Sequence, residues 1–197
     1  DSTPPGQIFA SPSSRYRTFP TLRPSNLPTT SSARLRVVHL TRKPQPGFHS
    51  FERLFRDIRQ ALPSDIEVRV VYSWFHSRGF FRRALNCLQA FFIRADVVHI
   101  TGDIHYLAPA LVGRRVVLTV HDLAPLHAKN GWQRKLFKYF WYDLPVRCAD
   151  CTTTISAAVR EELKAELGAS AEEITVIPNC ISSEFIQAPK AWPETPV

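Results

Sequence analysis

The sequence lacks methionine altogether, has only 7 glycines among 197 residues, and contains no long apolar run. A membrane-spanning helix needs about 18 or more consecutive apolar residues, so the sequence excludes one. An average protein of this length contains several methionines. Because Met is absent and the first residue is Asp1, we expect the chain to be a piece of a longer protein.

Three short catalytic or binding motifs are also missing. The sequence has no GxGxxG, GxxxxGK[ST] or GxSxG, which argues against a simple dinucleotide site, a P-loop and a hydrolase nucleophile elbow. Cys148 and Cys151 have CxxC spacing, but no second pair of ligands follows at zinc-finger spacing. We therefore expect buried, reduced cysteines, no metal site, and a reducing, cytoplasmic compartment.

Charge is present in excess of one sign: 25 Lys and Arg against 17 Asp and Glu give a net charge of +8. A basic balance favours phosphate, nucleic acid or an anionic membrane as partner, or only solubility. The sequence has no dense Lys/Arg block and no nucleic-acid-reading motif. We therefore expect no nucleic-acid partner.

The composition divides the chain into three parts. Residues 1–33 are rich in Pro, Ser and Thr without apolar periodicity, which predicts a disordered tail, either a transit peptide or a linker. Residues 34–187 are predicted to form one domain. Residues 188–197, with three prolines, are predicted to begin an interdomain linker.

Strand and helix patterns alternate throughout the predicted domain. Apolar periodicity predicts strands at 35–41, 66–72, 96–101, 116–120, 152–155 and 174–177, and helices at 50–62, 79–94, 132–147 and 156–167. Ser50 and Ser156 are predicted N-caps, and Gly168 a helix stop. Crossovers of this length require parallel strands. The fold class is therefore α/β: a single open, doubly wound, mostly parallel, Rossmann-like sheet.

Two of the predicted helices, 79–94 and 132–147, each combine an aromatic stripe with basic residues. In the first, the stripe contains Phe81, Leu85, Leu88 and Phe92. Such a helix covers a sheet, which we favour, or lies in an anionic membrane interface.

Polar side chains gather where the predicted strands end. In open parallel sheets, ligands bind outside the carboxyl ends of the strands. The residues found there are Arg42, Lys43, Gly47, His49, Ser50, Gly102, Asp103, His105, His121, Asp122, Ser156 and Asn179.

Each of these residues has a functional and a structural interpretation. Gly47 either lets backbone N–H groups approach a phosphate or only supplies a turn. His121 either binds a substrate hydroxyl or holds a charge near neutral pH, or is only a loop histidine that bonds its own neighbour. Asp103 either orients a hydroxylated ligand or caps the helical segment that begins near His105.

Four segments, in order and spacing, resemble one known family. They are Val97–Ala108 (VVHITGDIHYLA), Val117–Leu123 (VLTVHDL), Thr154–Ser156 (TIS) and Val176–Asn179 (VIPN), followed by Phe185. This set is similar to the N-terminal, acceptor-side domain of GT-B glycosyltransferases of the family-four, or group-one, type.

The resemblance implies two Rossmann-like domains facing each other across a cleft. It implies retaining glycosyl transfer from a nucleotide sugar to a glycan, lipid-linked or small-molecule acceptor, without a bound metal or further cofactor. His121 matches the histidine that touches the transferred sugar and is the predicted catalytic residue. Gly47, Phe48, His49 and Ser50 match the loop near the donor diphosphate. His105 matches the loop that borders the acceptor, and the remaining strand-end residues are expected to bind substrate.

The chain also departs from the family pattern. Only Gly47 stands in the first loop, and Pro178-Asn179-Cys180 replaces Pro-Asn-Gly. The donor-binding domain has no counterpart before Val197, so we expect the chain alone to be inactive. The alternative is a non-catalytic sugar- or nucleotide-binding subunit that borrows its donor domain from a partner. We expect a cytoplasmic protein, in peripheral contact with the inner membrane face if its amphipathic helices bind lipid.

Overall fold

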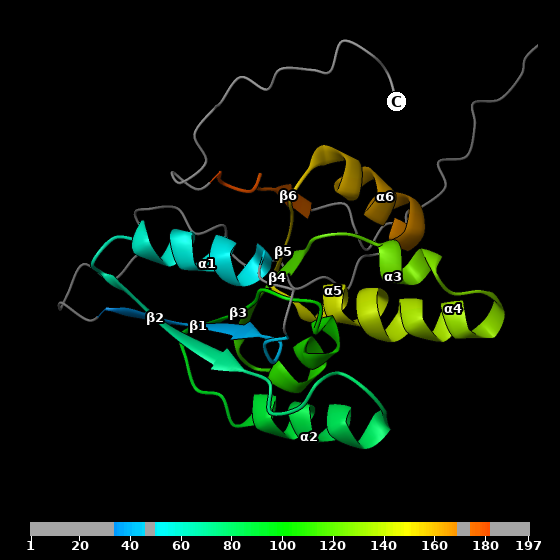
Figure 1. The fold of residues 1–197 in the computed structure, drawn as a ribbon, viewed down its shortest axis with the longest axis horizontal. Coiled ribbons are helices and arrows are strands. Elements are labelled where there is room, and N and C mark those ends of the chain that lie inside the picture. The colour runs from blue at the N-terminus through cyan, green and yellow to red at the C-terminus, as the bar shows by residue number, and fades with distance from the viewer. Residues whose placement is uncertain (1–33, 46–49, 169–173, 182–197) are drawn as a thin grey trace, which may run out of the picture. The chain divides into compact units, whose positions relative to one another are not determined.

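The computed structural model describes residues 34–45, 50–168 and 174–181. The predicted tail, the predicted linker and the loop residues Gly47, Phe48 and His49 lie outside these ranges. Within them, one sheet of parallel strands has the order β2-β1-β3-β4-β5-β6 (Figure 1). The strands are β1 (Leu35–Thr41), β2 (Ile66–Tyr72), β3 (Val97–Ile100), β4 (Arg115–Val120), β5 (Cys151–Thr154) and β6 (Ile174–Val176).

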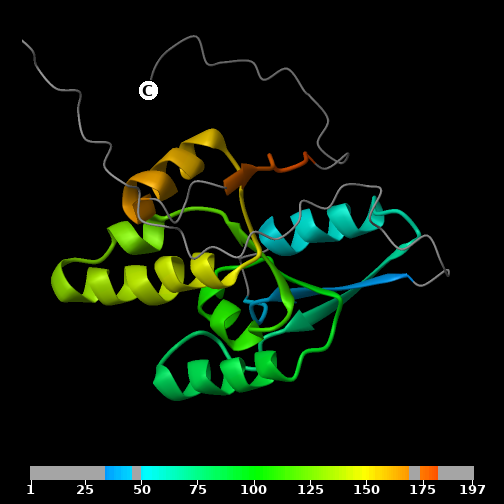
Figure 2. The same cartoon turned by 180° about the vertical axis from the view of Figure 1, so that it is seen from behind.

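Helices flank this sheet on both faces, which confirms the predicted fold class. Helix α1 lies on one side of β1 and α2 on the other, as the two opposite views in Figures 1 and 2 show. The helical elements are α1 (Ser50–Gln60), α2 (Phe80–Phe91), η2 (His105–Leu111), α3 (Ala124–His127), α4 (Gly131–Lys138), η3 (Tyr139–Asp143), α5 (Leu144–Cys148) and α6 (Ala157–Leu167). The short α3 was not expected from the sequence.

The centre of the core is an in-register row across three strands. Leu40 of β1 is opposite Ile100 of β3, which is opposite Leu118 of β4, and all three are fully buried. The chain runs from β1 outward to β2 and then crosses back past β1 to β3. The winding direction therefore reverses between β1 and β3, which is the point where open α/β sheets bind ligands.

The sheet also buries a set of histidine and threonine side chains under α1. The rings of His39 and His99 have centroids 5.2 Å apart, and Phe55 of α1 packs edge-on against both. His99 Nε2 lies 2.7 Å from Thr119 Oγ1, which lies 2.8 Å from Thr153 Oγ1. Burial lowers the pKa of His39 to about 4 and that of His99 to about 3. Both rings are therefore neutral at neutral pH and act as hydrogen-bonding core residues.

Helix α2 is oriented opposite to our expectation: its polar side, and not its apolar stripe, faces the interior of the domain. Its predicted apolar stripe is exposed, whereas Asn86, Gln89 and Ala90 are buried. The physical reason is a set of hydrogen bonds to the loop after β2. Gln89 accepts from Trp74 N at 2.8 Å and donates to Tyr72 O at 2.8 Å, and Asn86 bonds both backbone groups of Phe75 at 2.9 Å. The interpretation that this stripe covers the sheet is therefore wrong.

The predicted helix at 132–147 is one helical run with a π-helical turn in its middle. Elements α4, η3 and α5 follow one another without a break, and η3 precedes Pro145. Pro145 has no N–H to donate to the preceding turn, and a wider turn accommodates this loss. The π turn buries Tyr142 while Tyr139 and Phe140 stay exposed.

Other local predictions have mixed outcomes. Ser156 caps α6 by accepting from Val159 N at 3.3 Å, and Gly168 ends this helix at φ 61°, as predicted. Helix α1 begins at Ser50 itself, so Ser50 is the first helical residue and not, as predicted, the residue before it; that position lies outside the described ranges. Asp103 does not cap η2, because Ile104 holds that position and no side chain bonds there.

The cysteines are less buried than expected from the sequence, but they are reduced, as expected. Cys151 and Cys180 are exposed, so the expectation that all four are buried is wrong; all are free thiols. Burial raises the pKa of Cys148, which works against the thiolate that redox chemistry needs. Among the described helices, none has the length and apolar character to cross a membrane.

We predict that the stability of the domain falls as the pH drops from 6.5 towards 4. In this range an unfolded histidine binds a proton that buried His39 and His99 do not, so acid favours unfolding. Each such histidine contributes a slope of about 1.4 kcal/mol per pH unit. The free energy of unfolding in urea, measured from pH 8 to pH 4.5, should fall less steeply with decreasing pH in His99→Gln, by about that amount per pH unit. At pH 8 both states are neutral, so the difference measured there contains only the changes in packing and in the hydrogen bond to Thr119. An unchanged slope in the variant would contradict the assignment.

Candidate functional site

The loops after β1 and β3 meet at the reversal point of the sheet. Gly102, directly after β3, lies against Arg42, directly after β1. A Cβ added to Gly102 would sit 3.4 Å from the backbone nitrogen of Arg42 and 3.5 Å from Thr41 Oγ1. These are ordinary van der Waals distances, so the two loops pack directly against each other at this point. Gly102 does not have a positive φ angle, so the contact does not depend on a left-handed backbone.

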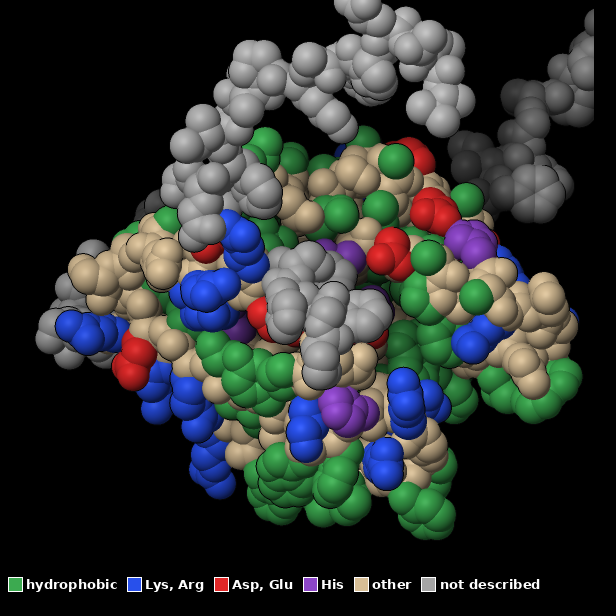
Figure 3. Space-filling model, in the orientation of Figure 1, with side chains coloured by type: hydrophobic (Ala, Val, Ile, Leu, Met, Phe, Trp, Pro, Cys, Tyr) green, Lys and Arg blue, Asp and Glu red, His purple; other side chains and the backbone are tan. Residues whose placement is uncertain are grey.

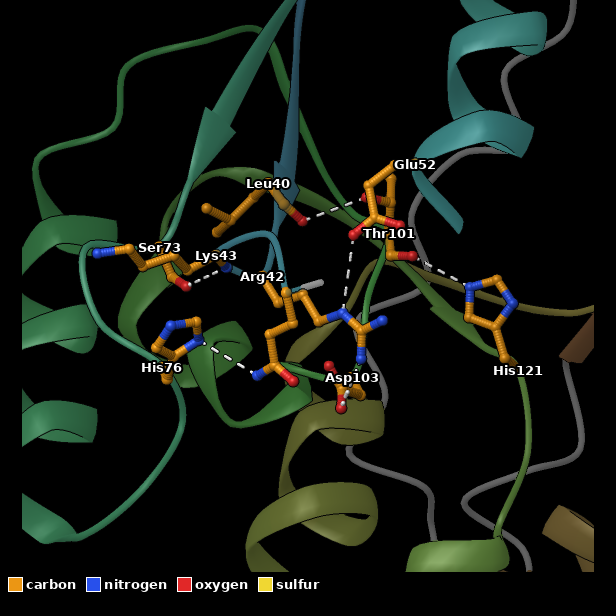
Figure 4. Close-up of polar contacts among 10 residues, drawn as sticks. Leu40, Arg42, Lys43, Glu52, Ser73, His76, Thr101, Asp103 and His121 are labelled. Atoms are coloured by element: carbon orange, nitrogen blue, oxygen red, sulfur yellow. Dashed lines mark hydrogen bonds and ion pairs between the residues drawn. The ribbon is translucent and has the colours of Figure 1, made fainter. Parts of the chain in front are cut away.

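Arg42 connects three elements at this edge. Its Nε lies 3.9 Å from Glu52 Oε1 in the first turn of α1, and its Nη1 lies 3.6 Å from Asp103 Oδ2 after β3 (Figure 4). The side chains of Arg42 and Glu52 are only 14% and 19% exposed. Sequence reasoning did not select Glu52. An acidic residue in the first helical turn after a basic loop is the signal that could have indicated it.

His121 follows β4 and is almost fully buried, with 6% of its surface exposed. Its Nε2 lies 3.1 Å from the carbonyl oxygen of Thr101. A carbonyl only accepts, so Nε2 carries the proton and Nδ1 holds the lone pair of the neutral ring. Burial lowers the pKa of His121, and the hydrogen bond to Thr101 partly opposes this shift. At neutral pH the ring is therefore an uncharged hydrogen-bonding group.

The π-helical turn η3 supports both loops that carry predicted site residues. Trp141 Nε1 donates to the carbonyl oxygen of Asp103 at 3.3 Å, and the Tyr142 hydroxyl donates to that of Asp122 at 3.2 Å. His105 Nδ1 donates to the carbonyl oxygen of Trp141 at 3.2 Å. This supporting role of η3 was not predicted from the sequence, although an aromatic run followed by Pro145 is a signal that could have indicated it.

His105 occupies the core rather than an open surface. Its ring is buried against Tyr142, with centroids 5.6 Å apart, and desolvation lowers its pKa to about 4. Its role at the acceptor stays a prediction.

Among the remaining predicted residues, Asp122 and Ser156 have local structural roles, whereas Asn179 has no role that its contacts define. Asp122 Oδ1 accepts from Ala124 N at 3.0 Å and so shapes the start of α3. Ser156 caps α6, and Asn179 is exposed after β6. The structure thus gathers Gly102, Asp103, His105, His121 and Asp122 around β3 and β4. Ser156 and Asn179 follow β5 and β6, further along the sheet.

A cationic cavity of about 200 Å³ opens beside Arg42. It is lined by Arg42, Lys43, Gln45, His76, Ser77, Arg78 and Asp103, from the loops after β1, β2 and β3. Ser73 Oγ accepts from Lys43 N at 2.9 Å, and the amide of Gln45 donates to His76 Nδ1 at 3.2 Å (Figure 4). Even when Glu52, the second partner of Arg42, is counted with Asp103, three cations outnumber two carboxylates, which suits an anionic group. His76 and Arg78, which follow the end of β2, were not among the residues predicted from the sequence.

Side chains that could bind a metal ion are scattered over the part of the chain that the structure describes. No cluster of three or more His, Cys, Asp or Glu side chains there could hold a metal ion.

The parallel sheet and its polar reversal point define the chain as a Rossmann-like ligand-binding domain. The sequence model of the protein family Glycosyltransferase Family 4 matches residues 21–185, and the chain belongs to this family. It is a glycosyltransferase module of the GT-B N-terminal type, a class that binds a sugar donor and an acceptor. No curated protein matches the chain.

We predict that Arg42→Met destabilises the domain by about 1–3 kcal/mol, because it leaves the partly buried Glu52 carboxylate without its cation. Glu52→Gln in the same chain should restore part of this loss. The measurement is the free energy of unfolding in urea for the two single variants and the double variant.

A matched control uses the exposed pair of Arg36 and Asp96, whose atoms lie 3.1 Å apart. Arg36→Met should change stability much less, since solvent screens that pair. Equal losses in Arg36→Met and Arg42→Met would contradict a special role for Arg42.

Proposed function

We propose that this domain supplies the acceptor side and part of the nucleotide-sugar cleft for retaining glycosyl transfer. The observation that carries the proposal is the position of Arg42 and His121 at the reversal point of a family-four domain. In the transfer, the bond from the anomeric carbon to the donor phosphate breaks, and a bond to an acceptor oxygen forms. The nucleotide diphosphate departs, and its phosphate oxygen takes the proton that the acceptor hydroxyl loses.

Departure of the diphosphate places negative charge where the cleft must stabilise it. We propose that side-chain cations do this without a bound metal. Support comes from Arg42, Lys43 and Arg78, which line one cavity with a single carboxylate, Asp103. The loop of residues 47–50 would add backbone groups at the start of α1, as the family resemblance implies.

His121 is proposed to bind a hydroxyl of the transferred sugar. Because its Nε2 donates to Thr101, the lone pair on Nδ1 is the group that would accept from a sugar hydroxyl. The ring is 6% exposed, so donor binding must displace atoms that cover it. Gly102, Asp103 and Asp122 would border the sugar from the neighbouring loops, with Ser156 and Asn179 further along the edge.

The acceptor is proposed to be a glycan, lipid-linked or small-molecule hydroxyl compound that enters beside η2 and the cationic cavity. The cavity favours an acceptor with an anionic group near its reacting hydroxyl. A lipid-linked acceptor would require peripheral contact with a membrane, which we propose as part of the function.

A non-catalytic role is the second candidate. The large apolar side chains exposed on α2 and α4 also suit a subunit that borrows its donor domain from a partner. Adding such a partner would then be necessary for any transfer.

We predict that the chain binds nucleotide sugars weakly and that His121→Ala reduces contact with the sugar ring. Saturation-transfer difference NMR with uridine, guanosine and adenosine diphosphate sugars should show smaller effects on sugar protons in the variant. His127→Ala is the matched control, because His127 lies on α3 and pairs with Glu162 instead. Equal sugar signals in both variants would remove His121 from the site.

We predict that the isolated 197-residue chain transfers sugar at least about a thousandfold more slowly than the roughly 10 s⁻¹ of a typical enzyme. A single sheet can line only one wall of a cleft, and lost positioning raises the barrier by several kcal/mol. Nucleotide release with a panel of donors and acceptors measures this rate. Ordinary enzymatic turnover by this chain alone would show that its own residues form a complete site.

A further inference from the structure

The face of α2 that points away from the sheet is apolar and exposed. Phe80 and Phe81 are 78% and 81% exposed, and Phe92 is 66% exposed. We define the α2 face as Phe80, Phe81, Leu85, Leu88, Phe91 and Phe92 with the arginines Arg78, Arg82 and Arg94, all of them exposed. In Figure 3, hydrophobic side chains gather at the edge where Figure 1 draws α2, and Lys or Arg side chains lie next to them.

The orientation of α2 is held by its inward side. Turning the apolar stripe toward the core would break the hydrogen bonds that Asn86 and Gln89 make with the backbone of Tyr72, Trp74 and Phe75. It would also break the bond from Asn86 to the Tyr106 hydroxyl at 3.0 Å. Buried polar groups without partners are costly. The exposed stripe is therefore a stable feature of the domain surface.

Charge distinguishes the α2 face from the second exposed stripe, on α4. Residues 73–95 contain arginines but no Asp or Glu. Of the arginines there, Arg83 donates to the carbonyl oxygen of Ser77 and lies over the Trp141 ring, while Arg82 stays exposed. On α4, by contrast, Arg134 pairs with Glu166 and Lys138 pairs with Asp143. Acidic residues thus pair with two of the three cations of α4, Lys135 being the third, so an anionic partner is favoured at α2 over α4.

We propose that the α2 face docks the domain on an anionic lipid bilayer. Helix α2 then lies flat in the interface, with its phenylalanines between the lipid chains and its arginines at the headgroup phosphates. Arginine near an anionic membrane and aromatic side chains below it are the two contributions that interfacial helices combine. The proposal specifies the membrane contact of the proposed function, but it requires no glycosyl transfer.

Docking through α2 places the cationic cavity near the headgroups. Arg78 belongs both to the α2 face and to the cavity lining, and His76 and Ser77 precede it directly. An acceptor anchored in the lipid could then present an anionic group to this cavity without leaving the membrane.

Co-sedimentation with vesicles tests the proposal on the 197-residue chain without any donor sugar. Phosphatidylcholine vesicles are compared with vesicles in which about one third of the lipid is phosphatidylglycerol. We expect pelleting only with the anionic vesicles, and its loss at about 1 M salt, where screening is nearly complete. Collisional quenching by brominated lipid should report Trp74, exposed in the loop before α2, and Trp74→Phe should remove that signal.

Two matched variants locate the docking surface. Phe81→Ser with Phe92→Ser should weaken binding about tenfold or more, since both side chains leave the lipid interface. Arg82→Gln should weaken it about fivefold. Trp132→Ser with Phe140→Ser, the α4 variant, removes one exposed aromatic residue from α4 and one from the adjoining η3 instead, and should leave vesicle binding unchanged. Circular dichroism and thermal unfolding establish that each variant is folded.

Three outcomes would overturn the proposal. No pelleting on anionic vesicles is one, and equal losses in the α2 and α4 variants is another. The third is a doubled mass by light scattering without lipid that Phe81→Ser with Phe92→Ser abolishes, since a second copy would then cover the α2 face. Because no donor is present, none of these outcomes bears on the proposed transferase activity.

Discussion

The parallel, in-register pairing of β1 with β3 and of β3 with β4 is the constraint on which the rest of the structure depends. The buried row of Leu40, Ile100 and Leu118 sets this register. Because all the strands run in the same direction, their carboxyl ends lie at one edge, and residues far apart in sequence meet there. Arg42 can therefore reach Asp103, and His121 can bond the carbonyl oxygen of Thr101. A slip of one residue in β3 would separate both pairs and expose the buried row.

Elements were predictable where local chemistry decides them. Strand β2 has the predicted bounds, and Ser156 caps α6 as expected, because alternation and capping act over a few residues. Helix α2 was also predictable as a helix. Its orientation was not, since periodicity identifies an apolar face but not the side of the molecule on which it lies. Asn86 and Gln89 decide the orientation through the loop after β2, and no pattern within the helix reveals that loop as their partner.

In the candidate site, too, some residues could be predicted from local sequence, and others depend on contacts made by the whole fold. The rule that ligands bind at strand ends selected Gly102, Asp103 and His121, and the structure brings these residues to neighbouring loops. Glu52 was missed because the strand-end rule selects residues of the loops, whereas Glu52 lies in the first turn of the helix that follows the loop of Arg42. The support from Trp141 and Tyr142 depends on a π turn, which shifts side-chain directions relative to an ordinary helix. Local patterns suggest an acidic residue in the first turn of α1 and a disturbed helix before Pro145, but the partners of these residues follow from the fold as a whole.

The polar inward side of α2 links the proposed site to the surface. The hydrogen bonds of Asn86 and Gln89 hold the loop that leads to His76, which lines the cationic cavity. Those bonds also leave the phenylalanines of α2 no place in the core, because the space beneath the helix is filled by polar groups that need partners. The position of the loop beside the cavity and the exposure of the apolar surface of α2 therefore depend on the same two residues. An apolar substitution at Asn86 would loosen the loop and, by allowing α2 to rotate, withdraw the apolar face from the surface.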